Sequence, residues 1–256
     1  MNYPARLERL RALLSSLPCD ALLIEHPIDL LYLTGLELSS GKLIVTQQDA
    51  CLIVDGRYYE RCRNQSLYPT LLLKDHLLRD WILDSDIHHL GFDQENTSYQ
   101  GFSKLTELMG EEKTSTHWLK IIPLESPVQK LRLIKDADEM QALRKAAQLG
   151  YEGYELIVSL LREGVIESEL AFELEFFWKK QGGSRLAFDP TIAFGTNSSM
   201  PHYRAGSSKL TLNSPVLIDI GVVLNHYHSD MTRVVFFGTP SPILKTIYSI
   251  VDEAKN

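Results

Sequence analysis

Cysteine is scarce in this sequence, and the few cysteines exclude two kinds of structural site. Cys19, Cys51 and Cys62 are an odd number, and no two of them have the CxxC spacing. A disulfide framework needs pairs of cysteines, and a zinc knuckle needs cysteines close together along the chain. We therefore expect three free thiols, buried or at the surface, and no site built from cysteine.

An excess of basic charge and a long apolar run are also missing. The 33 acidic residues outnumber the 26 lysines and arginines, and the net charge is -7. Non-specific affinity for nucleic acid comes mainly from clustered basic side chains, so no nucleic-acid partner is expected. No run reaches the length of a membrane-spanning helix, and the charged N-terminal segment lacks the apolar stretch of a signal peptide. We expect a cytoplasmic protein without a membrane partner.

The length favours two domains of ordinary size. The chain has 256 residues, of which 44% are hydrophobic, so each half can bury a core of its own. Pro123 and Pro127 bracket a polar stretch, and acidic residues typical of a helix N-terminus follow at 136–139. We place the boundary near Glu125, which gives domains at 1–125 and 126–256.

Apolar runs and helical spacings alternate along both halves, which predicts an α/β (α+β) fold. Leucines at helical spacing precede a short apolar run at 21–24, and the runs at 42–46 and 50–54 are typical of a hairpin. In the second half we expect helices at about 137–161 and 167–180, the latter stopped by the glycines at 182 and 183. The pattern then predicts strands at 187–194, 209–223 and 227–237, and a final helix from about residue 246.

The last two predicted strands each carry one aspartate, Asp219 and Asp230. If the hairpin turns at Leu224 and Asn225, Asp219 faces Asp230 directly, with Cβ atoms roughly 4.5 to 5.5 Å apart. Like charges at that separation repel, so a shared proton or a bound divalent cation must offset the repulsion. Alternatively, both aspartates are solvated on an edge hairpin, or a one-residue bulge places them on opposite faces.

Two histidines alternate with the second aspartate on the same predicted strand. His226, His228 and Asp230 can project from one strand face, and imidazole and carboxylate groups together are acceptable zinc ligands. Histidines at a strand end are also commonly solvated, or they support a ligand without touching the metal. Thr232 lies on the same face, where it either donates a hydrogen bond to the site or is an ordinary strand residue.

These residues resemble the pita-bread metallopeptidases, in particular the Xaa-Pro aminopeptidases and the Xaa-Pro dipeptidases (prolidases). The family pattern is Asp-x-Gly, a turn, and Tyr-x-Ser-Asp-x-Thr-Arg, which this chain matches at 219–221 and 227–233. Further segments that resemble the family lie at 131–135, 188–190, 195–198 and 201–203, and 55–58 is similar to a segment of the creatinase-type N-terminal domain. The resemblance covers nearly the whole chain. It implies a creatinase-like N-terminal domain followed by the first part of a pita-bread catalytic domain.

The resemblance also implies an activity: metal-dependent hydrolysis of the Xaa-Pro bond at the N-terminus of a peptide, as in aminopeptidase P or prolidase. Asp219 and Asp230 would bind two divalent metal ions, Mn2+ or Co2+, with Zn2+ as an alternative. His202 would be a catalytic and substrate-binding residue, or else a loop histidine without such a role. The implied partners are short peptides with proline at the second position and a second copy of the chain in a homodimer.

Two departures from the family pattern bear on activity. His226 stands where family members usually have glycine, at a turn position that tolerates positive φ. The family's remaining ligands, one histidine and two glutamates, lie beyond the helix that starts near Thr246, so we expect the chain to be inactive by itself and part of a longer peptidase rather than a truncated gene. The alternatives are a non-catalytic pita-bread module that binds peptides or proteins, and metal-free amidino hydrolysis of the creatinase type.

Overall fold

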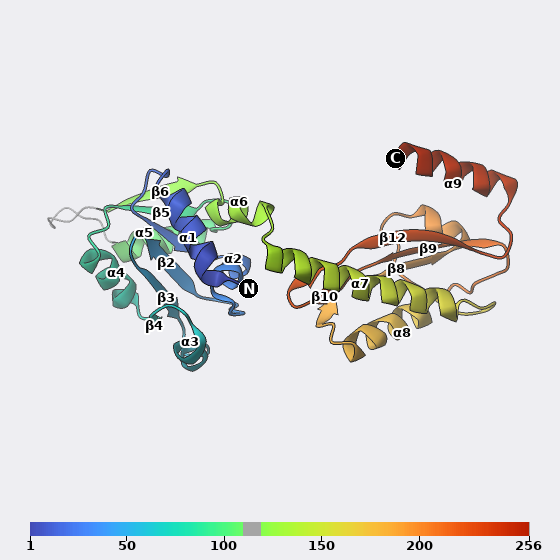
Figure 1. Ribbon diagram of the computed structural model, residues 1–256, viewed down its shortest axis with the longest axis horizontal. Helices are drawn as coiled ribbons and strands as arrows, with labels where there is room; N and C mark the ends of the chain where they lie inside the picture. Colours follow the sequence, from blue (N-terminus) through green and yellow to red (C-terminus); the bar gives the residue numbers. More distant parts are fainter. Residues whose placement is uncertain (110–118, 256) are drawn as a thin grey trace. The chain divides into compact units, whose positions relative to one another are not determined.

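The chain folds into two compact units, which are described separately. The computed structural model describes residues 1–109 and 119–255, and the units are Met1–Lys135 and Asp136–Asn256 (Figure 1). Each unit has its own sheet structure and apolar core, which confirms the mixed α and β fold that the sequence predicts. Within the described part of the chain, no helix has both the length and the apolar character needed to cross a membrane.

A six-stranded mixed sheet forms the centre of the first unit. Its strands are β1 (Ala21–Ile24), β2 (Lys42–Thr46), β3 (Ala50–Val54), β4 (Thr70–Leu72), β5 (His89–Asp93) and β6 (Lys120–Leu124), and its helices are α1 (Tyr3–Leu14), α2 (Pro27–Thr34), α3 (Tyr59–Gln65), α4 (Asp75–Asp84), α5 (Tyr99–Met109) and α6 (Pro127–Leu133). The strand order is β4-β3-β2-β1-β5-β6, in which β2 pairs antiparallel with both β1 and β3. The predicted hairpin is therefore β2 and β3. The three cysteines are free, as predicted, and all of them are buried in this unit and not at the surface.

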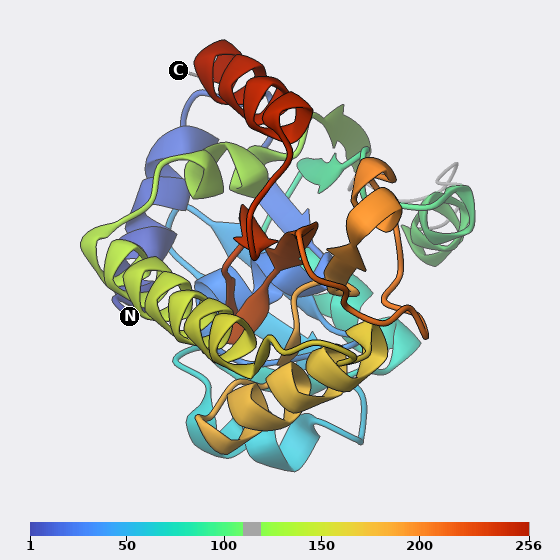
Figure 2. The same cartoon turned by 90° about the vertical axis from the view of Figure 1, so that its right-hand side faces the viewer.

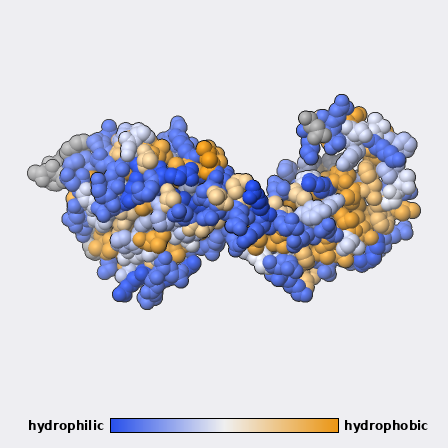
Figure 3. Space-filling model, in the orientation of Figure 1, coloured by the Kyte–Doolittle hydropathy of each residue, from blue (hydrophilic) through white to orange (hydrophobic). Residues whose placement is uncertain are grey.

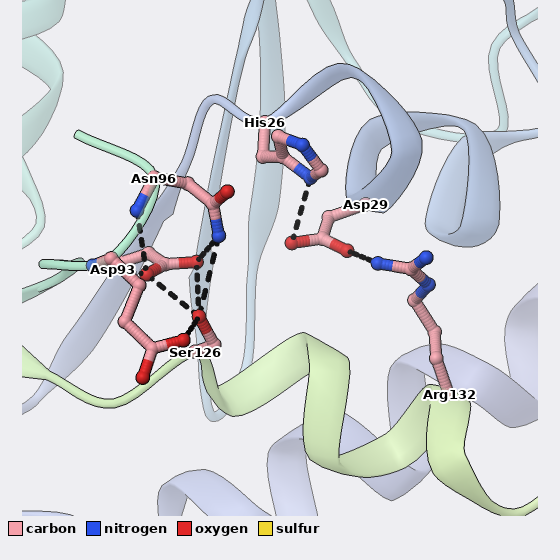
Figure 4. A network of polar contacts seen from close by, with 7 residues as sticks. His26, Asp29, Asp93, Asn96, Ser126 and Arg132 are labelled. Atoms are coloured by element: carbon pink, nitrogen blue, oxygen red, sulfur yellow. Dashed lines mark hydrogen bonds and ion pairs between the residues drawn. The ribbon is translucent and has the colours of Figure 1, made fainter. Parts of the chain in front are cut away.

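Helix α6 belongs to the first unit, so the chain divides after Lys135, ten residues beyond the predicted boundary at Glu125. Val128 of α6 is buried in the core of this unit, and Arg132 donates a 2.8 Å hydrogen bond to the buried carboxylate of Asp29 in α2 (Figure 4). Burial raises the pKa of Asp29, and the adjacent guanidinium of Arg132 opposes that shift. The prolines around residue 125 mark a turn inside the unit, because the helix after them packs on α1 and α2.

A second polar group fixes the start of α6. Ser126 has a positive φ of 28°, and its Oγ lies 2.9 Å from Asp93 Oδ1 and 2.7 Å from Glu95 Oε2 (Figure 4). Asn96 donates a 2.8 Å hydrogen bond to Asp93 Oδ2 in the same group. Polar contacts therefore hold both ends of the helix on the first unit.

Two three-stranded sheets and the helices around them form the second unit. Its strands are β7 (Arg185–Leu186), β8 (Thr191–Phe194), β9 (Ser214–Ile220), β10 (Val222–Leu224), β11 (Tyr227–His228) and β12 (Met231–Phe237), and its helices are α7 (Ala137–Leu160), α8 (Glu167–Lys180), the 3-10 helix η1 (Gly195–Ser199) and α9 (Pro242–Lys255). The sheet orders are β11-β10-β7 and β12-β9-β8. Helices α7 and α8 lie side by side (Figures 1 and 2). Their buried side chains form one core with alternate residues of β9, including Leu149, Leu174, Trp178, Ile218 and Ile220.

The two long helices begin and end as the sequence predicts. The side chain of Asp136 accepts a 2.8 Å hydrogen bond from Glu139 N, and Glu139 Oε2 accepts a 2.9 Å bond from Asp136 N, which is the reciprocal cap typical of a helix N-terminus. Helix α8 ends just before Gly182, whose φ of 90° is a conformation that glycine adopts readily. The glycines at 182 and 183 therefore stop the helix, as expected.

The three predicted strands of this unit all differ from the expectation. The runs at 209–223 and 227–237 are each divided, into β9 and β10 and into β11 and β12, and the two parts of each run lie in different sheets. Two of the three runs also become strands later than expected. The run at 209–223 becomes a strand only from Ser214, because Leu210 uses its backbone elsewhere: it accepts from Gly164 N at 2.8 Å and donates to Val165 O at 2.9 Å. The run at 187–194 becomes a strand only from Thr191, and Pro190 before it has no N–H to donate. The connection from 195 to 213 instead lies along the N-terminus of α8.

The final helix forms as predicted but starts earlier, at Pro242. Its apolar side chains Ile243, Ile247, Ile250 and Val251 are each more than half exposed. Tyr248 meets Phe236 of β12 edge to face, with 5.9 Å between the ring centroids. Figure 3 shows further apolar surface on the second unit, in addition to that of α9, and this surface lies below α9 in that view. The described residues of α9 are all at least partly exposed.

Candidate metal-binding site

The hairpin that carries the two aspartates turns at Asn225 and His226, one position later than predicted. Leu224 pairs with Tyr227, and the same register continues along β9 and β12, where Asp219 faces Thr232. The prediction that Asp219 faces Asp230 directly is therefore wrong.

Backbone geometry explains where the turn falls. Asn225 has a φ of 49° and His226 a φ of 71°, and tight two-residue hairpin turns of this kind require positive φ at both central residues. Asparagine adopts positive φ more readily than leucine does, so a turn at Leu224 and Asn225 would place the less suitable residue first. The sequence therefore contains one signal for the observed register, in which Leu224 pairs with Tyr227: asparagine is better suited than leucine to the first position of the turn.

The two aspartates still share a face of the hairpin. Asp230 lies just before β12 and two residues before Thr232, and extending the alternation of β12 by one residue places it on the side of Thr232 and Asp219. Across paired strands such diagonal neighbours have Cα atoms roughly 7 to 8 Å apart, within reach of one bridging cation. The two ladders on either side of Gly221 and Asp230 have the same offset, so neither strand contains the extra residue of a bulge between them.

Threonines flank Asp219 on both neighbouring strands. Thr232 Oγ1 donates a 2.7 Å hydrogen bond to Asp219 Oδ1, so of the two alternatives for Thr232 the structure favours the hydrogen bond. Thr191 of β8 faces Asp219 from the other side and is buried. The sequence analysis did not single out Thr191, whose part in the site follows only from sheet pairing.

Gly221 of the Asp-x-Gly motif is required by a close approach of two backbone segments. A Cβ at this position would lie 2.3 Å from Ser229 O and 2.6 Å from the ring of Phe188. On the other side of this crossing, Ser229 N donates to Val222 O at 2.9 Å. The glycine therefore lets the hairpin strands meet just before Asp230.

His202 lies exposed in a turn of the connection between β8 and β9. Tyr203 N donates to Met200 O at 3.2 Å, which closes the turn around it. The turn is tied to β8, because Thr191 Oγ1 donates a 2.8 Å hydrogen bond to Tyr203 O. One threonine thus links the His202 segment to the strand position beside Asp219.

The histidines of the hairpin do not assemble into a zinc site. His226 stands in the turn and His228 faces Val223 of β10, and both side chains are exposed. Among residues 1–109 and 119–255, no three His, Cys, Asp or Glu side chains lie close enough together to hold one metal ion. The structure brings together Asp219 and Asp230 with their threonine neighbours, and it leaves His226 and His228 outside this group.

An open cavity of about 340 Å³ lies beside Asp230. Its lining combines that carboxylate with the basic side chains of Arg233 and Lys255, and with Ala147 and Gly150 of α7. The cavity follows the edge of β12, and the residues that line it do not include the His202 turn.

The donor set of the two aspartates fits part of a divalent-metal site. Within the described part of the chain, neither Asp219 nor Asp230 is within ion-pair distance of a lysine or an arginine. Two like charges without an ion-pair partner among the described residues favour a bound cation, and carboxylate oxygens are hard ligands that suit Mn2+.

Comparison with known families accounts for nearly the whole chain. Residues 6–134 match the Creatinase/Prolidase N-terminal domain, and residues 141–256 match metallopeptidase family M24. The chain therefore belongs to metallopeptidase family M24 and carries a creatinase/prolidase N-terminal domain, as the sequence motifs indicate.

Individual proteins that are similar to this chain support the assignment to this family. An uncharacterized peptidase of Bacillus subtilis, YqhT, is 31% identical over 254 residues, which are 98% of this chain and 70% of that protein. The Xaa-Pro dipeptidase of Pyrococcus furiosus is 29% identical over 252 residues, with the same shares of 98% and 70%. The solved structure of an Xaa-Pro dipeptidase from Bacillus anthracis has a TM-score of 0.89 and 32% identity, over 99% of this chain and 70% of that one. The chain thus spans about 70% of the length of these relatives.

Proposed function

We propose that the protein is a divalent-metal-dependent exopeptidase that hydrolyses Xaa-Pro bonds, with Asp219 and Asp230 as metal ligands and His202 as a catalytic and substrate-binding residue. The observation that carries this proposal is the pair of carboxylates on one hairpin, neither of which has an ion-pair partner among the described residues. Membership of a metallopeptidase family supports it. Similarity to Xaa-Pro dipeptidases supports the choice of substrate.

Mn2+ or Co2+ is the metal that we assign to these residues, as two ions per site, with Zn2+ as the alternative. Asp219 and Asp230 offer hard oxygen donors, and the three thiols lie in the other unit of the chain. Metal bound there would supply Lewis-acid polarisation of the scissile carbonyl. The chain's own contribution is to hold the carboxylates in place, since Thr232 fixes one oxygen of Asp219 by a hydrogen bond.

His202 suits the recognition of a short peptide with proline at its second position. The bond before proline has no N–H, so a side chain that recognises this bond must donate to its carbonyl oxygen. An imidazole N–H is such a donor, and the exposed turn leaves it accessible to a peptide. The choice between dipeptides and longer peptides depends on the space beyond the proline.

We further propose that the 256-residue chain is inactive by itself, because its metal site needs more ligands. Divalent ions of this kind take about six ligands, and two carboxylates supply only part of that number. The described residues contain no third His, Cys, Asp or Glu close to the pair. We also propose a cytoplasmic location, since free thiols are typical of reducing compartments, and a homodimer, as the family resemblance implies.

The test is proline release from Xaa-Pro dipeptides by the protein purified from its own cells, stripped of metal and reloaded with Mn2+ or Co2+. Loss of a ligand in Asp219→Ala or Asp230→Ala is expected to lower kcat/KM by about 1000-fold or more. Asp80→Ala, at an exposed position of α4, is the control and keeps full activity. Full activity in Asp219→Ala would overturn the proposal. Peptide binding without hydrolysis or metal binding would instead favour a non-catalytic binding module.

A further inference from the structure

Glu167 has a buried carboxylate at the centre of the segment that carries His202. It is the first residue of α8, and it is 0% exposed. Its Oε1 accepts hydrogen bonds from Phe194 N at 2.8 Å and Asn197 Nδ2 at 2.9 Å. Its Oε2 accepts from Tyr203 OH at 2.7 Å and Gly206 N at 3.1 Å. Both oxygens of the carboxylate are therefore occupied by neutral donors.

The four donors all belong to one stretch, residues 194–206, which leaves the end of β8 and contains η1 and the His202 turn. Within this stretch Asn197 Nδ2 also donates to Tyr203 OH at 2.9 Å. The backbone at the start of α8 binds the same connection, since Glu167 N donates to Ser208 O at 3.2 Å and Ser168 N donates to Gly206 O at 3.0 Å. One carboxylate thus fixes the chain on both sides of the turn.

The energetics indicate that Glu167 does more than begin a helix. Burying an ionised carboxylate is costly unless every oxygen is hydrogen-bonded, and an acidic residue stabilises a helix N-terminus equally well from the surface. Glu169 already supplies such an exposed carboxylate in the same turn of α8. A buried, fully bonded polar group selects one conformation of the segments around it. The segment selected here is the one that holds His202.

Tyr203 connects this anchor to the metal-binding face. Its hydroxyl donates to Glu167, and its carbonyl oxygen accepts the hydrogen bond from Thr191. Thr191 in turn faces Asp219 across β8 and β9. Because His202 immediately precedes Tyr203, its place relative to Asp219 depends on these two hydrogen bonds.

We propose that Glu167 is a positioning residue, which holds the His202 turn against β8 and so sets the place of His202 relative to the proposed metal ligands. The effect on catalysis rests on the proposed role of His202 in substrate binding, whereas the anchoring of the turn can be measured independently of activity. The hydrogen bond to Glu167 raises the pKa of Tyr203, which supplies one readout of the anchor.

The first experiment compares Glu167→Gln with Glu173→Gln, a control at an exposed position of the same helix. The glutamine keeps the shape of the side chain, but its amide group can accept at one end only, so one pair of donors loses its acceptor. We expect the pKa of Tyr203 to fall toward its ordinary value, measured by NMR with ring-labelled tyrosine and assigned with Tyr203→Phe. The amide of Phe194 or Gly206 should exchange at least about tenfold faster, and the control should change neither.

The second readout is the kinetics of proline release by Glu167→Gln and Glu173→Gln, each introduced into the protein as its cells produce it. A displaced binding side chain is expected to raise KM about tenfold with a smaller change in kcat, whereas partial unfolding lowers only the active fraction and therefore kcat. Tyr203→Phe removes one of the four hydrogen bonds, so it should raise KM in the same direction if Glu167→Gln does not fold.

The possible results separate the anchor from the proposed activity. Unchanged titration of Tyr203 and unchanged amide exchange in Glu167→Gln overturn the anchor, and an unchanged KM in an active variant overturns the positioning role. If the wild-type protein hydrolyses no Xaa-Pro peptide, the proposed function fails. The NMR and exchange data then still decide whether Glu167 fixes the turn.

Discussion

Thr232 faces Asp219 across β9 and β12, and its hydroxyl donates a 2.7 Å hydrogen bond to Asp219 Oδ1. The bond fixes the orientation of the carboxylate, and in the described part of the chain its other oxygen, Oδ2, accepts no hydrogen bond. An oriented carboxylate binds a metal ion more tightly than one that rotates freely, because less conformational freedom is lost on binding. Three of the predictions below concern this hairpin, and the fourth concerns a carboxylate of the first unit.

Replacing Thr232 by valine removes the hydroxyl and keeps the shape of the side chain. We expect the affinity for Mn2+ of the natural protein to fall roughly 10- to 100-fold, which is the usual effect of losing a hydrogen bond to a metal ligand. Thr232→Ser keeps the donor and should bind like the wild type. Calorimetric titration of the metal-free protein measures the difference, and equal affinity in the valine variant would show that the bond does not tune the site.

Gly221→Ala is expected to destabilise the second unit by about 1 to 3 kcal/mol, the usual cost of overpacking. The added Cβ would lie 2.3 Å from Ser229 O, and neither backbone segment can move without disturbing the hairpin. Gly56→Ala is the control, since a Cβ at that position meets no atom within 4 Å. Urea unfolding measures both variants. A loss of stability as small as that of the control would contradict the close approach.

His226→Gly is expected to stabilise the protein by about 1 kcal/mol. His226 has a φ of 71°, which costs a non-glycine residue energy in the folded state, although glycine loses more entropy on folding. Asn225→Gly should gain less, because asparagine tolerates its φ of 49° better than histidine tolerates this conformation. Thermal unfolding compares the two. A destabilised His226→Gly would show that contacts of the imidazole outweigh the backbone strain.

Asp20 predicts a pH dependence of stability in the first unit. It accepts hydrogen bonds from His89 N at 2.7 Å and His88 N at 3.0 Å. Although partial burial acts in the opposite direction, these bonds lower the pKa of Asp20 below its usual value. A carboxyl group whose folded-state pKa is lowered stabilises the fold above its unfolded pKa of about 3.9, and this stabilisation is lost as the pH falls through the folded value.

Asp20→Asn should therefore be less stable than the wild type at pH 7, and the difference should close as the pH falls below about 4. The side chain is 47% exposed, so solvent screening keeps the effect below about 1 kcal/mol. Urea unfolding between about pH 2.5 and 7 measures it, with Asp84→Asn at the exposed end of α4 as the control. A gap that does not change with pH would mean that the charge of Asp20 has no part in stability.

Local patterns predicted most of the elements of this chain, because their causes lie within a few residues of one another. The helix N-terminus at the acidic residues 136–139 and the stop at Gly182 are examples, and both are found at the predicted positions. The domain boundary was harder to place, since the helix after Glu125 is held by contacts with Asp29 and the core of the first unit. Those contacts are far away in the sequence.

The candidate site divides in the same way. The motifs around Asp219, Gly221 and Asp230 resemble those of a metallopeptidase family, and the comparison confirms that family. The partner of Asp219 was predicted wrongly, because the register of a hairpin depends on a turn whose placement can shift by one residue. Glu167 was read only as the start of a helix, since its hydrogen-bond donors lie 27 to 39 residues away.

The sequence by itself determined where most helices and strands form, that both aspartates lie on one hairpin, and, through its motifs, the family to which the chain belongs. These properties depend on residue type and local spacing. Only the tertiary structure decided that Thr232 faces Asp219 and that Glu167 anchors the His202 turn. Both relationships join residues from different elements, so they depend on the packing that brings those elements together.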